Sequence, residues 1–342
     1  MFSLDQYQAA RTSAVVIDRS ARGKITLTGS DRIAFLHALF TNDIAQLKKG
    51  TGVYSAYLTP QGRMISDMRV VETGDELFLD VEEAVAAPLA ERLDTLIFAE
   101  DAQVKNVTND FALFGVVGPT STDVIVTATG VQVSSLTNQY DNLREGALTI
   151  VRDDAFGVRG FDMYVDRAGA GPLREKLLAA GAMTASDATV EVLRVEAGRP
   201  KFGADMNTDT IPLEAGIEDR AISLTKGCYV GQEVIVRVLH RGHGRVARRL
   251  VGLLFADGSS PAKGDAVFSG DKHVGDVTSA VFSPTKGAPI ALAYVQRDYT
   301  SVGTELIVKT SQGTTSARVH ALPFTGLTDP ADRADPADPP DH

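Results

Sequence analysis

The sequence predicts a mixed α and β protein that ends in an all-β module. The chain has 342 residues and a mass of 36.4 kDa, which at roughly 150 residues per domain corresponds to two or three domains. Up to about Arg249, alternating apolar runs are interspersed with stretches of helical period. Beyond it, short alternating strands separated by Gly, Pro, Asp and Ser continue to about Leu322, which is typical of an all-β module.

The first predicted elements follow from alternation and turn chemistry. Lys24–Thr28 alternates and ends at Gly29, as a strand does. Ser30-Asp31 then begins a helix, because apolar residues recur on one face after it. That face consists of Ile33, Leu36, Leu39 and Phe40. Three strands follow at Val53–Leu58, Met64–Val71 and Leu77–Val81, joined by Pro60-Gln61-Gly62 and Thr73-Gly74-Asp75.

The middle of the chain alternates between helices and strands. A helical stretch runs from about Glu83 to Phe98, where Pro88 marks either a kink or the true first turn. Phe111–Val117 is a buried strand that Gly118-Pro119 ends, and residues 148–165 are two strands around a glycine-containing turn. Two helices follow at Pro172–Ala180 and Asp187–Gly198, and Pro200 stops the second.

Composition and charge exclude several classes of protein. The single cysteine allows no internal disulfide and no CxxC cage for zinc or a cluster, which fits a reducing cytosol. No stretch is apolar enough to span a membrane, and the amino terminus has neither a signal nor a transit pattern, so we expect a cytoplasmic protein. The net charge of −10 opposes attraction of the whole molecule to nucleic acid or anionic membrane.

The carboxy-terminal segment 328–342 is expected to be a disordered acidic tail. An aspartate recurs there at every third position with prolines between, and no apolar side chain other than proline exceeds alanine in size. Such a segment cannot offset its own ordering entropy.

The segment TKGCYVGQE, residues 225–233, is the strongest local signal. Its cysteine, Cys228, lies between Gly227 and Gly231, with Lys226 two residues before it and a stretch of helical potential directly after. Backbone amides, a helix amino terminus and a nearby lysine lower a thiol pKa, and the thiolate is the reactive form. We therefore take Cys228 and Lys226 as candidate catalytic residues, although a free cysteine can equally be buried and inert. The remaining signature residues are Gly227, Tyr229, Gly231, Gln232 and Glu233.

The stretch RVLHRGHGRVARR, residues 237–249, forms a basic ribbon in an acidic protein. Arg237, Arg241 and Arg245 could bind an anion such as a polyglutamate tail, a phosphate backbone or an acidic protein, or could form ordinary surface ion pairs. No aromatic residue interleaves with the arginines, so a stacking platform for nucleic acid is not evident. The two histidines lack a third ligand nearby, and we predict no metal site.

Scattered charged residues among apolar ones form a third group of candidates. Asp67 lies in the strand MISDMRVV, while Arg194 and Glu196 lie in the helix LRVEAG. An alternating strand places such an acid on its polar face, but a carboxylate beside a ligand could accept the N–H groups of a heterocycle. The chain has no P-loop, GxGxxG or GxSxG motif.

These segments together resemble the folate-binding proteins related to the T protein of the glycine cleavage system. The resemblance covers nearly all of residues 10–325, and KGCYVGQE is similar to the signature of the YgfZ branch, whose mitochondrial counterparts assist iron–sulfur protein maturation. The other matching segments are residues 23–43, 52–70, 156–165, 193–206, 211–217, 274–284 and 290–295.

The resemblance implies an α+β fold of three domains in a cloverleaf, with ferredoxin-like lobes around a central tetrahydrofolate channel and a carboxy-terminal β-barrel. It divides the chain into a discontinuous first domain, 1–50 plus 153–245, a ferredoxin-like domain, 51–152, and a barrel, 246–325. It also implies that Asp67, Arg194 and Glu196 contact folate.

Two departures separate the chain from the branches of this family. Val158 stands where the aminomethyltransferases carry a glutamate that helps hold the pterin, and a valine cannot accept N–H bonds. In contrast, IPLEAGI, residues 211–217, is closer to the aminomethyltransferase form than to the YgfZ form. We therefore expect the chain to lie between the two branches.

Several functions agree with this sequence. The first is a tetrahydrofolate-binding accessory protein for maturation or repair of iron–sulfur enzymes, in which Cys228 touches clients or cluster carriers only transiently, because one cysteine cannot hold a cluster. The second is a tetrahydrofolate-dependent aminomethyl or methyl transferase, in which Asp67 steers a proton. The third is a module linked to tRNA through the ribbon, and the fourth is a degenerate fold that serves only as a scaffold.

Overall fold

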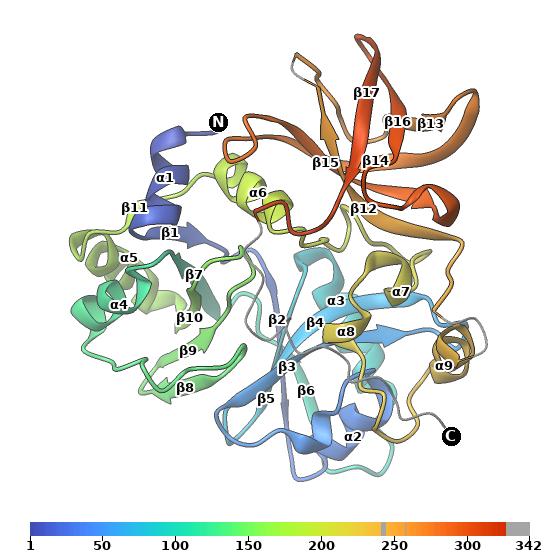
Figure 1. Ribbon diagram of the computed structural model, residues 1–342. Helices are drawn as coiled ribbons and strands as arrows, with labels where there is room; N and C mark the ends of the chain where they lie inside the picture. Colours follow the sequence, from blue (N-terminus) through green and yellow to red (C-terminus); the bar gives the residue numbers. More distant parts are fainter. Residues whose placement is uncertain (241–243, 257, 326–342) are drawn as a thin grey trace, which may run out of the picture.

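Two β-sheets and a closed β-barrel organise the chain in the computed structural model, which describes residues 1–240, 244–256 and 258–325 (Figure 1). The first sheet has the strand order β3-β4-β5-β2-β6 and is antiparallel. Its strands are β2 (Gly23–Thr28), β3 (Thr51–Leu58), β4 (Met64–Glu72), β5 (Leu77–Val81) and β6 (Gln103–Asn106). Helices α2 (Arg32–Leu39) and α3 (Glu83–Asp94) belong to the same lobe and share its apolar core with the sheet.

The second sheet has the order β11-β1-β7-β10-β9-β8 and is antiparallel except for the pair β1–β11. Its strands are β1 (Val15–Asp18), β7 (Phe111–Val117), β8 (Asn142–Glu145), β9 (Leu148–Arg152), β10 (Gly160–Asp166) and β11 (Met183–Thr184). Helices α4 (Ser121–Thr129) and α5 (Ala170–Ala179) cover one face, and their apolar side chains complete a core around Phe161 and Met163. Helix α1 (Leu4–Thr12) packs near β1 and β11.

The chain crosses between the two sheets twice. It leaves the second sheet after β1, builds the whole of the first sheet from β2 to β6, and returns at β7. Residues 51–152 therefore contribute strands to both sheets. The division into 1–50 plus 153–245 and 51–152 stays a prediction.

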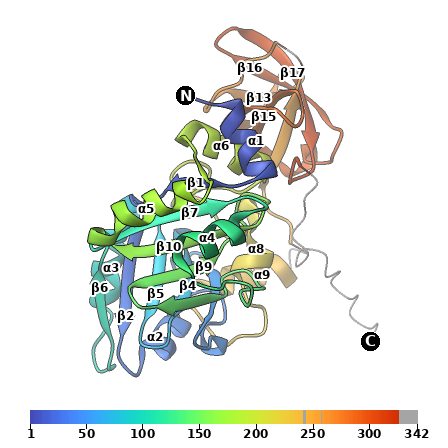
Figure 2. The same ribbon diagram turned by 90° about the vertical axis from the view of Figure 1, so that its left-hand side faces the viewer.

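The carboxy-terminal module is a closed barrel of six strands, as the alternation after Arg249 predicts. Figure 2 shows it above the two sheets, with α6 (Asp187–Glu196) beneath it. Its order is β12-β15-β14-β13-β16-β17, and closure leaves no free edge. The strands are β12 (Arg248–Phe255), β13 (Ala266–Ser269), β14 (Lys272–Ser283), β15 (Ala288–Gln296), β16 (Glu305–Thr310) and β17 (Gly313–His320).

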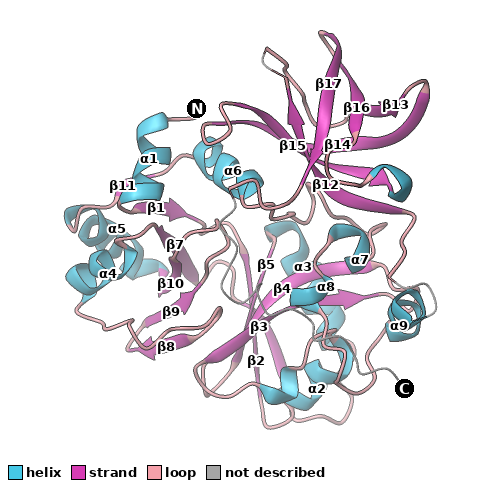
Figure 3. Ribbon diagram, in the orientation of Figure 1, coloured by secondary structure: helices cyan, strands magenta, loops and turns pink. Residues whose placement is uncertain are grey.

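The segment between α6 and the barrel is mostly loop with three short helices, which Figure 3 shows in cyan. These are α7 (Pro212–Ala215), α8 (Glu218–Ala221) and α9 (Gln232–His240). In the described parts of the chain, no helix is long and apolar enough to cross a membrane. The predicted acidic tail, 328–342, lies outside the described residues.

Candidate functional site

A cavity of about 570 Å³ lies between the two sheets and α6. Its charged lining is balanced, with seven acidic and seven basic side chains, so it can receive a ligand that carries both N–H donors and anionic groups. The acidic residues are Asp18, Asp67, Glu82, Glu83, Asp153, Asp187 and Glu191, and the basic ones are Arg19, Arg22, Arg69, Arg194, Arg199, Lys201 and Arg220. The apolar part includes Ile17, Tyr54, Met68, Tyr140, Phe156 and Val190.

Asp67 is a wall residue of this cavity and projects from β4. The Tyr54 hydroxyl on β3 donates a 2.6 Å hydrogen bond to Asp67 Oδ2. Burial raises the pKa of Asp67 above its ordinary value, and the hydrogen bond from Tyr54 opposes that rise. The Arg220 guanidinium lies over the Tyr54 ring, 5.2 Å from its centre, in a cation–π contact.

Tyr140 lines the same cavity with an unusual backbone. Its φ is +66°, in the left-handed region that a bulky residue adopts rarely. Two contacts hold this strained backbone. Tyr140 N donates to Arg152 O (2.9 Å), and the Tyr140 Cβ packs against Gly52, where a Cβ would lie only 3.0 Å from it.

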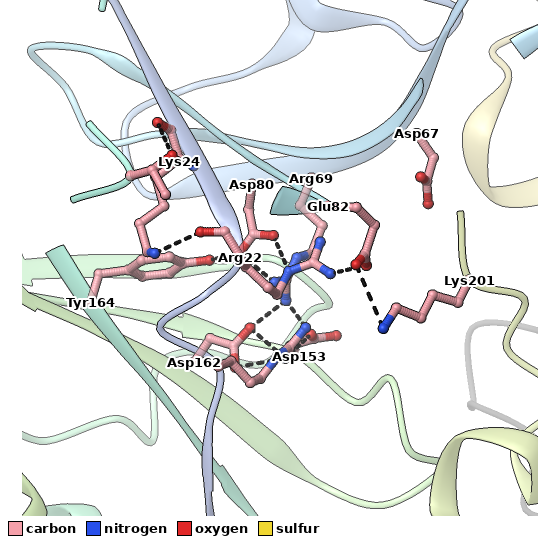
Figure 4. Close-up of polar contacts among 12 residues, drawn as sticks. Arg22, Lys24, Asp67, Arg69, Asp80, Glu82, Asp153, Asp162, Tyr164 and Lys201 are labelled. Atoms are coloured by element: carbon pink, nitrogen blue, oxygen red, sulfur yellow. Dashed lines mark hydrogen bonds and ion pairs between the residues drawn. The ribbon is translucent and has the colours of Figure 1, made fainter. Parts of the chain in front are cut away.

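A buried network of arginines and carboxylates joins the two sheets (Figure 4), and part of it lines the cavity. Arg69 on β4 donates to Asp80 on β5, and also to Asp153 and Asp162 of the second sheet lobe. Arg19 donates to Asp162 (2.8 Å) and Arg22 to Asp80 and Glu82, while the Tyr164 hydroxyl donates to Asp80 (2.6 Å). Burial alone would raise the pKa of Asp80, but Arg22 and Arg69 outweigh it and hold that pKa well below its usual value.

Arg194 lies at the wall formed by α6, and its guanidinium is fully used within the protein. Its five N–H groups donate to Glu191 (2.9 and 2.6 Å), Asp205 (2.7 Å), Ser279 (2.7 Å) and the Arg199 carbonyl. A guanidinium has five N–H donors, so none remains for a ligand. Arg194 thus lines the cavity but holds other parts of the protein in place, and its contact with folate stays a prediction.

Glu196 lies outside the cavity lining, and the expectation that it contacts a ligand together with Arg194 stays a prediction. Its carboxylate is fully buried and accepts from Tyr7 and Arg11 (both 2.7 Å), from Ser283, and from the Thr285 amide (3.4 Å). The reason is helical geometry: residues two positions apart on a helix point about 200° apart, so Arg194 and Glu196 face different neighbours.

The cysteine segment contributes no residue to the cavity lining. Cys228 is exposed and free, and Gly227 beside it is also exposed. Lys226 is buried, and its predicted role beside the thiol stays a prediction. Its ammonium donates to the carbonyls of His37, Phe40 and Asn42, at the carboxy-terminal end of α2. Burial lowers the pKa of Lys226 to about 8.

The other signature residues hold this segment against the first sheet. Tyr229 is buried, with the Lys226 ammonium 5.2 Å from its ring centre. Gly231 has φ +83°, and a Cβ there would lie 2.5 Å from the Thr59 carbonyl oxygen, so the backbones touch. Gln232 and Glu233 begin α9.

Some arginines of the basic ribbon are exposed on the surface, and others form ion pairs with acidic side chains. Arg237 and Arg245 are exposed, while Arg241 lies outside the described residues. The arginines that begin β12 form ion pairs with the short helices: Arg248 with Glu214 (3.2 Å) and Arg249 with Glu218. No group of three or more His, Cys, Asp or Glu side chains in the described ranges is arranged to hold a metal ion.

Two family models match the chain and together cover most of it. The GCVT N-terminal domain matches residues 2–226, and the glycine cleavage T-protein C-terminal barrel domain matches residues 248–325. The chain belongs to the glycine cleavage T-protein family. The barrel and the α+β body are therefore the expected family fold, whereas the matches do not distinguish the YgfZ branch.

Relatives of this T-protein family member extend over nearly its whole length. Proteins named aminomethyltransferase from Listeria monocytogenes serotype 4a (strain HCC23) and Bacillus subtilis (strain 168) are each 29% identical, over 93% of this chain and 88% and 90% of their own. The crystal structure of glycine cleavage system aminomethyltransferase T from Bartonella henselae superposes with a TM-score of 0.86 at 24% identity. It covers 94% of this chain and 89% of that one, and it confirms the fold.

Most of the charged lining escapes sequence reasoning. The arginines of the network stand singly in strands and loops, separated from their partners by 11 to 143 positions. A partial signal exists for Arg69, which follows Asp67 by two residues and so lies on the same face of β4. Val158, the departure from the aminomethyltransferase pattern, packs against an apolar cluster near α1 and does not line the cavity.

Proposed function

We propose that this T-protein family member binds tetrahydrofolate in the cavity and transfers a one-carbon unit between folate and an amine, as an aminomethyltransferase. The observation that carries the proposal is the half-buried Asp67 carboxylate, held by Tyr54 in a cavity of about 570 Å³. The names of the relatives support the reaction class, and the family resemblance of the Asp67 segment supports the ligand.

The lining fits the chemistry of a reduced folate. Asp67 can accept N–H groups of a pterin, Tyr54, Tyr140 and Phe156 offer ring surfaces, and cationic side chains such as Lys201 suit the glutamate carboxylates. The cavity volume falls within the range of small-molecule sites, about 300–1,000 Å³. Because Val158 packs elsewhere, acceptance of pterin N–H groups falls to Asp67 rather than to a glutamate at position 158.

Each residue of the wall has a defined task in this proposal. Tetrahydrofolate supplies the nitrogen atoms that accept or give up the one-carbon unit. Asp67 orients the ligand and holds or moves a proton, which its raised pKa favours, because an acid works best when its pKa lies nearer the working pH. Tyr54 fixes the carboxylate, and the buried network keeps the two sheets at a constant separation.

The test is calorimetric titration of the purified protein with tetrahydrofolate under anaerobic conditions, together with an assay of methylenetetrahydrofolate formation from an aminomethyl donor. We expect wild type to bind and turn over, Asp67→Asn to lose both, and Cys228→Ala to keep both. Absence of binding refutes the folate site. Binding without turnover on a panel of aminomethyl donors refutes the transferase.

A second function is favoured by the position of the thiol. Cys228 is exposed on a segment that Lys226, Tyr229 and Gly231 fix to the first sheet, so a partner protein can reach it. This suits an accessory protein for iron–sulfur enzymes that uses Cys228 in transient contact. Complementation of a strain lacking the YgfZ-type protein tests it. Wild type, Cys228→Ala and Asp67→Asn are compared in parallel, and Cys228→Ala is expected to fail. Rescue by Cys228→Ala at the wild-type level rules this function out.

A further inference from the structure

Strand β14 of the barrel carries a bulge where it meets the wall of the cavity. Its register against β15 shifts between Val277 and Ser279, which leaves Thr278 as the extra residue. Neighbouring side chains of a regular strand point to opposite faces. Here the two neighbouring hydroxyls reach one atom: Thr278 Oγ1 and Ser279 Oγ both donate to Asp205 Oδ1, over 2.5 and 2.7 Å. The bulge is what aims both at the same carboxylate.

The second oxygen of Asp205 serves the cavity. Asp205 Oδ2 accepts from Arg194 Nη1 (2.7 Å) and from the backbone N–H of Lys201 (3.0 Å). Arg194 and Lys201 both line the cavity, as does the segment 199–200 between them. The Asp205 side chain has no exposed surface. The buried Asp205 carboxylate therefore connects the barrel to the cavity wall: Oδ1 binds the barrel and Oδ2 binds the wall.

Arg194 completes the connection. Its Nη2 donates directly to Ser279 Oγ (2.7 Å), while its other donors go to Glu191, Asp205 and the Arg199 carbonyl. Because the guanidinium is rigid and planar, these acceptors fix the relative positions of α6, segment 199–201 and β14. The part of the cavity wall made by α6 and segment 199–201 is thus held together by the Arg194 guanidinium, which has no N–H donor left for a ligand.

We propose that Thr278 and Ser279 are positioning residues of the cavity, acting through Asp205 and Arg194 to hold α6 and segment 199–201 against the ligand. The proposal rests on the proposed function, since it assigns the barrel a part in tetrahydrofolate binding. The barrel then contributes to affinity by ordering the wall, without a barrel residue in the cavity lining.

The fold supplies a matched control on the same strand. Ser283, four residues along β14, donates to Glu196, which Tyr7 and Arg11 also contact. This second connection also joins α6 to the barrel, is buried, and uses a serine hydroxyl on a carboxylate. It does not line the cavity. Ser283→Ala therefore removes a comparable contact between the same elements without disturbing the wall.

The experiment measures the Kd for tetrahydrofolate and the melting temperature of the full chain. Ser279→Ala and Thr278→Val, which removes the hydroxyl but keeps the shape, are expected to weaken binding about three- to tenfold, the effect of a lost hydrogen bond. Two variants are expected to bind within about twofold of wild type: Thr278→Ser, which keeps the hydroxyl, and Ser283→Ala. Ser283→Ala is nevertheless expected to lower the melting temperature as much as Ser279→Ala does. In turnover, Ser279→Ala is expected to raise KM with kcat unchanged.

Two results would overturn the inference. If Ser279→Ala and Ser283→Ala change Kd equally, the barrel acts only through general stability. If Thr278→Val and Ser279→Ala both bind as wild type does, Asp205 needs no support from the barrel. Failure of wild type to bind tetrahydrofolate is distinct from both, because it removes the folate site itself and this inference with it.

Discussion

The Tyr54 hydroxyl reaches Asp67 diagonally across the β3–β4 ladder. Tyr54 is paired in register with Arg69, and Asp67 with Ala56, so the two side chains lie on one face two positions apart. An aromatic side chain can span the distance between such diagonal positions, and the Tyr54 hydroxyl does so in its 2.6 Å hydrogen bond to Asp67 Oδ2. The residue that fixes the carboxylate is therefore set by strand register.

Tyr54→Phe is expected to move the acid limb of the pH profile of kcat/KM to higher pH. Burial raises the pKa of Asp67 and the hydrogen bond from Tyr54 opposes that rise, so its loss raises the pKa further. The carboxylate then becomes protonated at a higher pH than in wild type. The measurement is the profile of the folate-dependent reaction for both proteins, and of tetrahydrofolate binding.

Tyr57→Phe is the control, because its hydroxyl also lies on β3 but accepts from Arg92 Nε (3.1 Å) outside the cavity. Each variant is expected to lose about 1 kcal/mol of stability. An acid limb that moves equally in both variants, or in neither, contradicts the assignment.

Arg69→Met is expected to destabilise the protein by about 3–5 kcal/mol, because it leaves buried carboxylates without their shared partner. Arg69 donates to three of them and joins the two sheets. Urea unfolding at neutral pH measures the loss. Arg144→Met removes a partly exposed pair with Glu76 (3.0 Å) and is expected to cost only about 0–1 kcal/mol.

The cost of Arg69→Met should also depend on pH. The folded pKa of Asp80 is lowered, so its pairing stabilises the wild type above the ordinary value of 3.8 and is lost as pH falls towards the folded value. The difference between wild type and variant is then largest at neutral pH and shrinks below about pH 4. A difference that grows on acidification would be inconsistent with this network.

Local patterns were sufficient for the elements with strong alternation or a clear amphipathic face. Four strands of the first sheet (β2 to β5), α6 and the barrel fall where the sequence predicts them, whereas β6 was not predicted. Helix α4 was missed because its residues STDVIVTAT are largely β-branched, a composition that favours strands. Its helical form depends on packing beside α5 and on Gly130, which ends it with φ +78°.

The site was less predictable than the fold, because it depends on contacts between distant segments. Asp67 and Arg194 do line the cavity, while Glu196 and the cysteine segment do not. Lys226 illustrates the limit: its position two residues before Cys228 suggested an electrostatic role, but the side chain turns to the end of α2, 184 to 189 positions away. The short spacing between Lys226 and Cys228 in the sequence does not show which groups the Lys226 side chain contacts.

Gly231→Ala is expected to destabilise the protein by about 2 kcal/mol, since the backbone is left-handed and a Cβ would meet the Thr59 carbonyl. Gly227→Ala in the same segment is the control: a Cβ there has no heavy atom within 4 Å, and a change within about 0.5 kcal/mol is expected. Urea unfolding compares the two. Equal effects would show that the segment is not fixed through Gly231.

Lys226→Met is expected to lower the free energy of unfolding at pH 7 by about 1–3 kcal/mol, because three backbone carbonyls lose a charged donor. The pH dependence is more diagnostic. Burial lowers the folded pKa of Lys226 to about 8, against an ordinary value of 10.5. Between these values the unfolded chain retains a proton that the folded chain has released, so this group makes the wild type more stable as pH rises.

The variant lacks that titration, and the difference in unfolding free energy between wild type and Lys226→Met is expected to widen from about pH 8 to 10.5. Taking the difference cancels the other groups that titrate in this range. Urea unfolding at pH 7, 8, 9 and 10 gives the curve, with Lys48→Met, an exposed lysine, as control. A difference that stays flat or narrows across this range would mean that burial does not lower the pKa of the Lys226 ammonium.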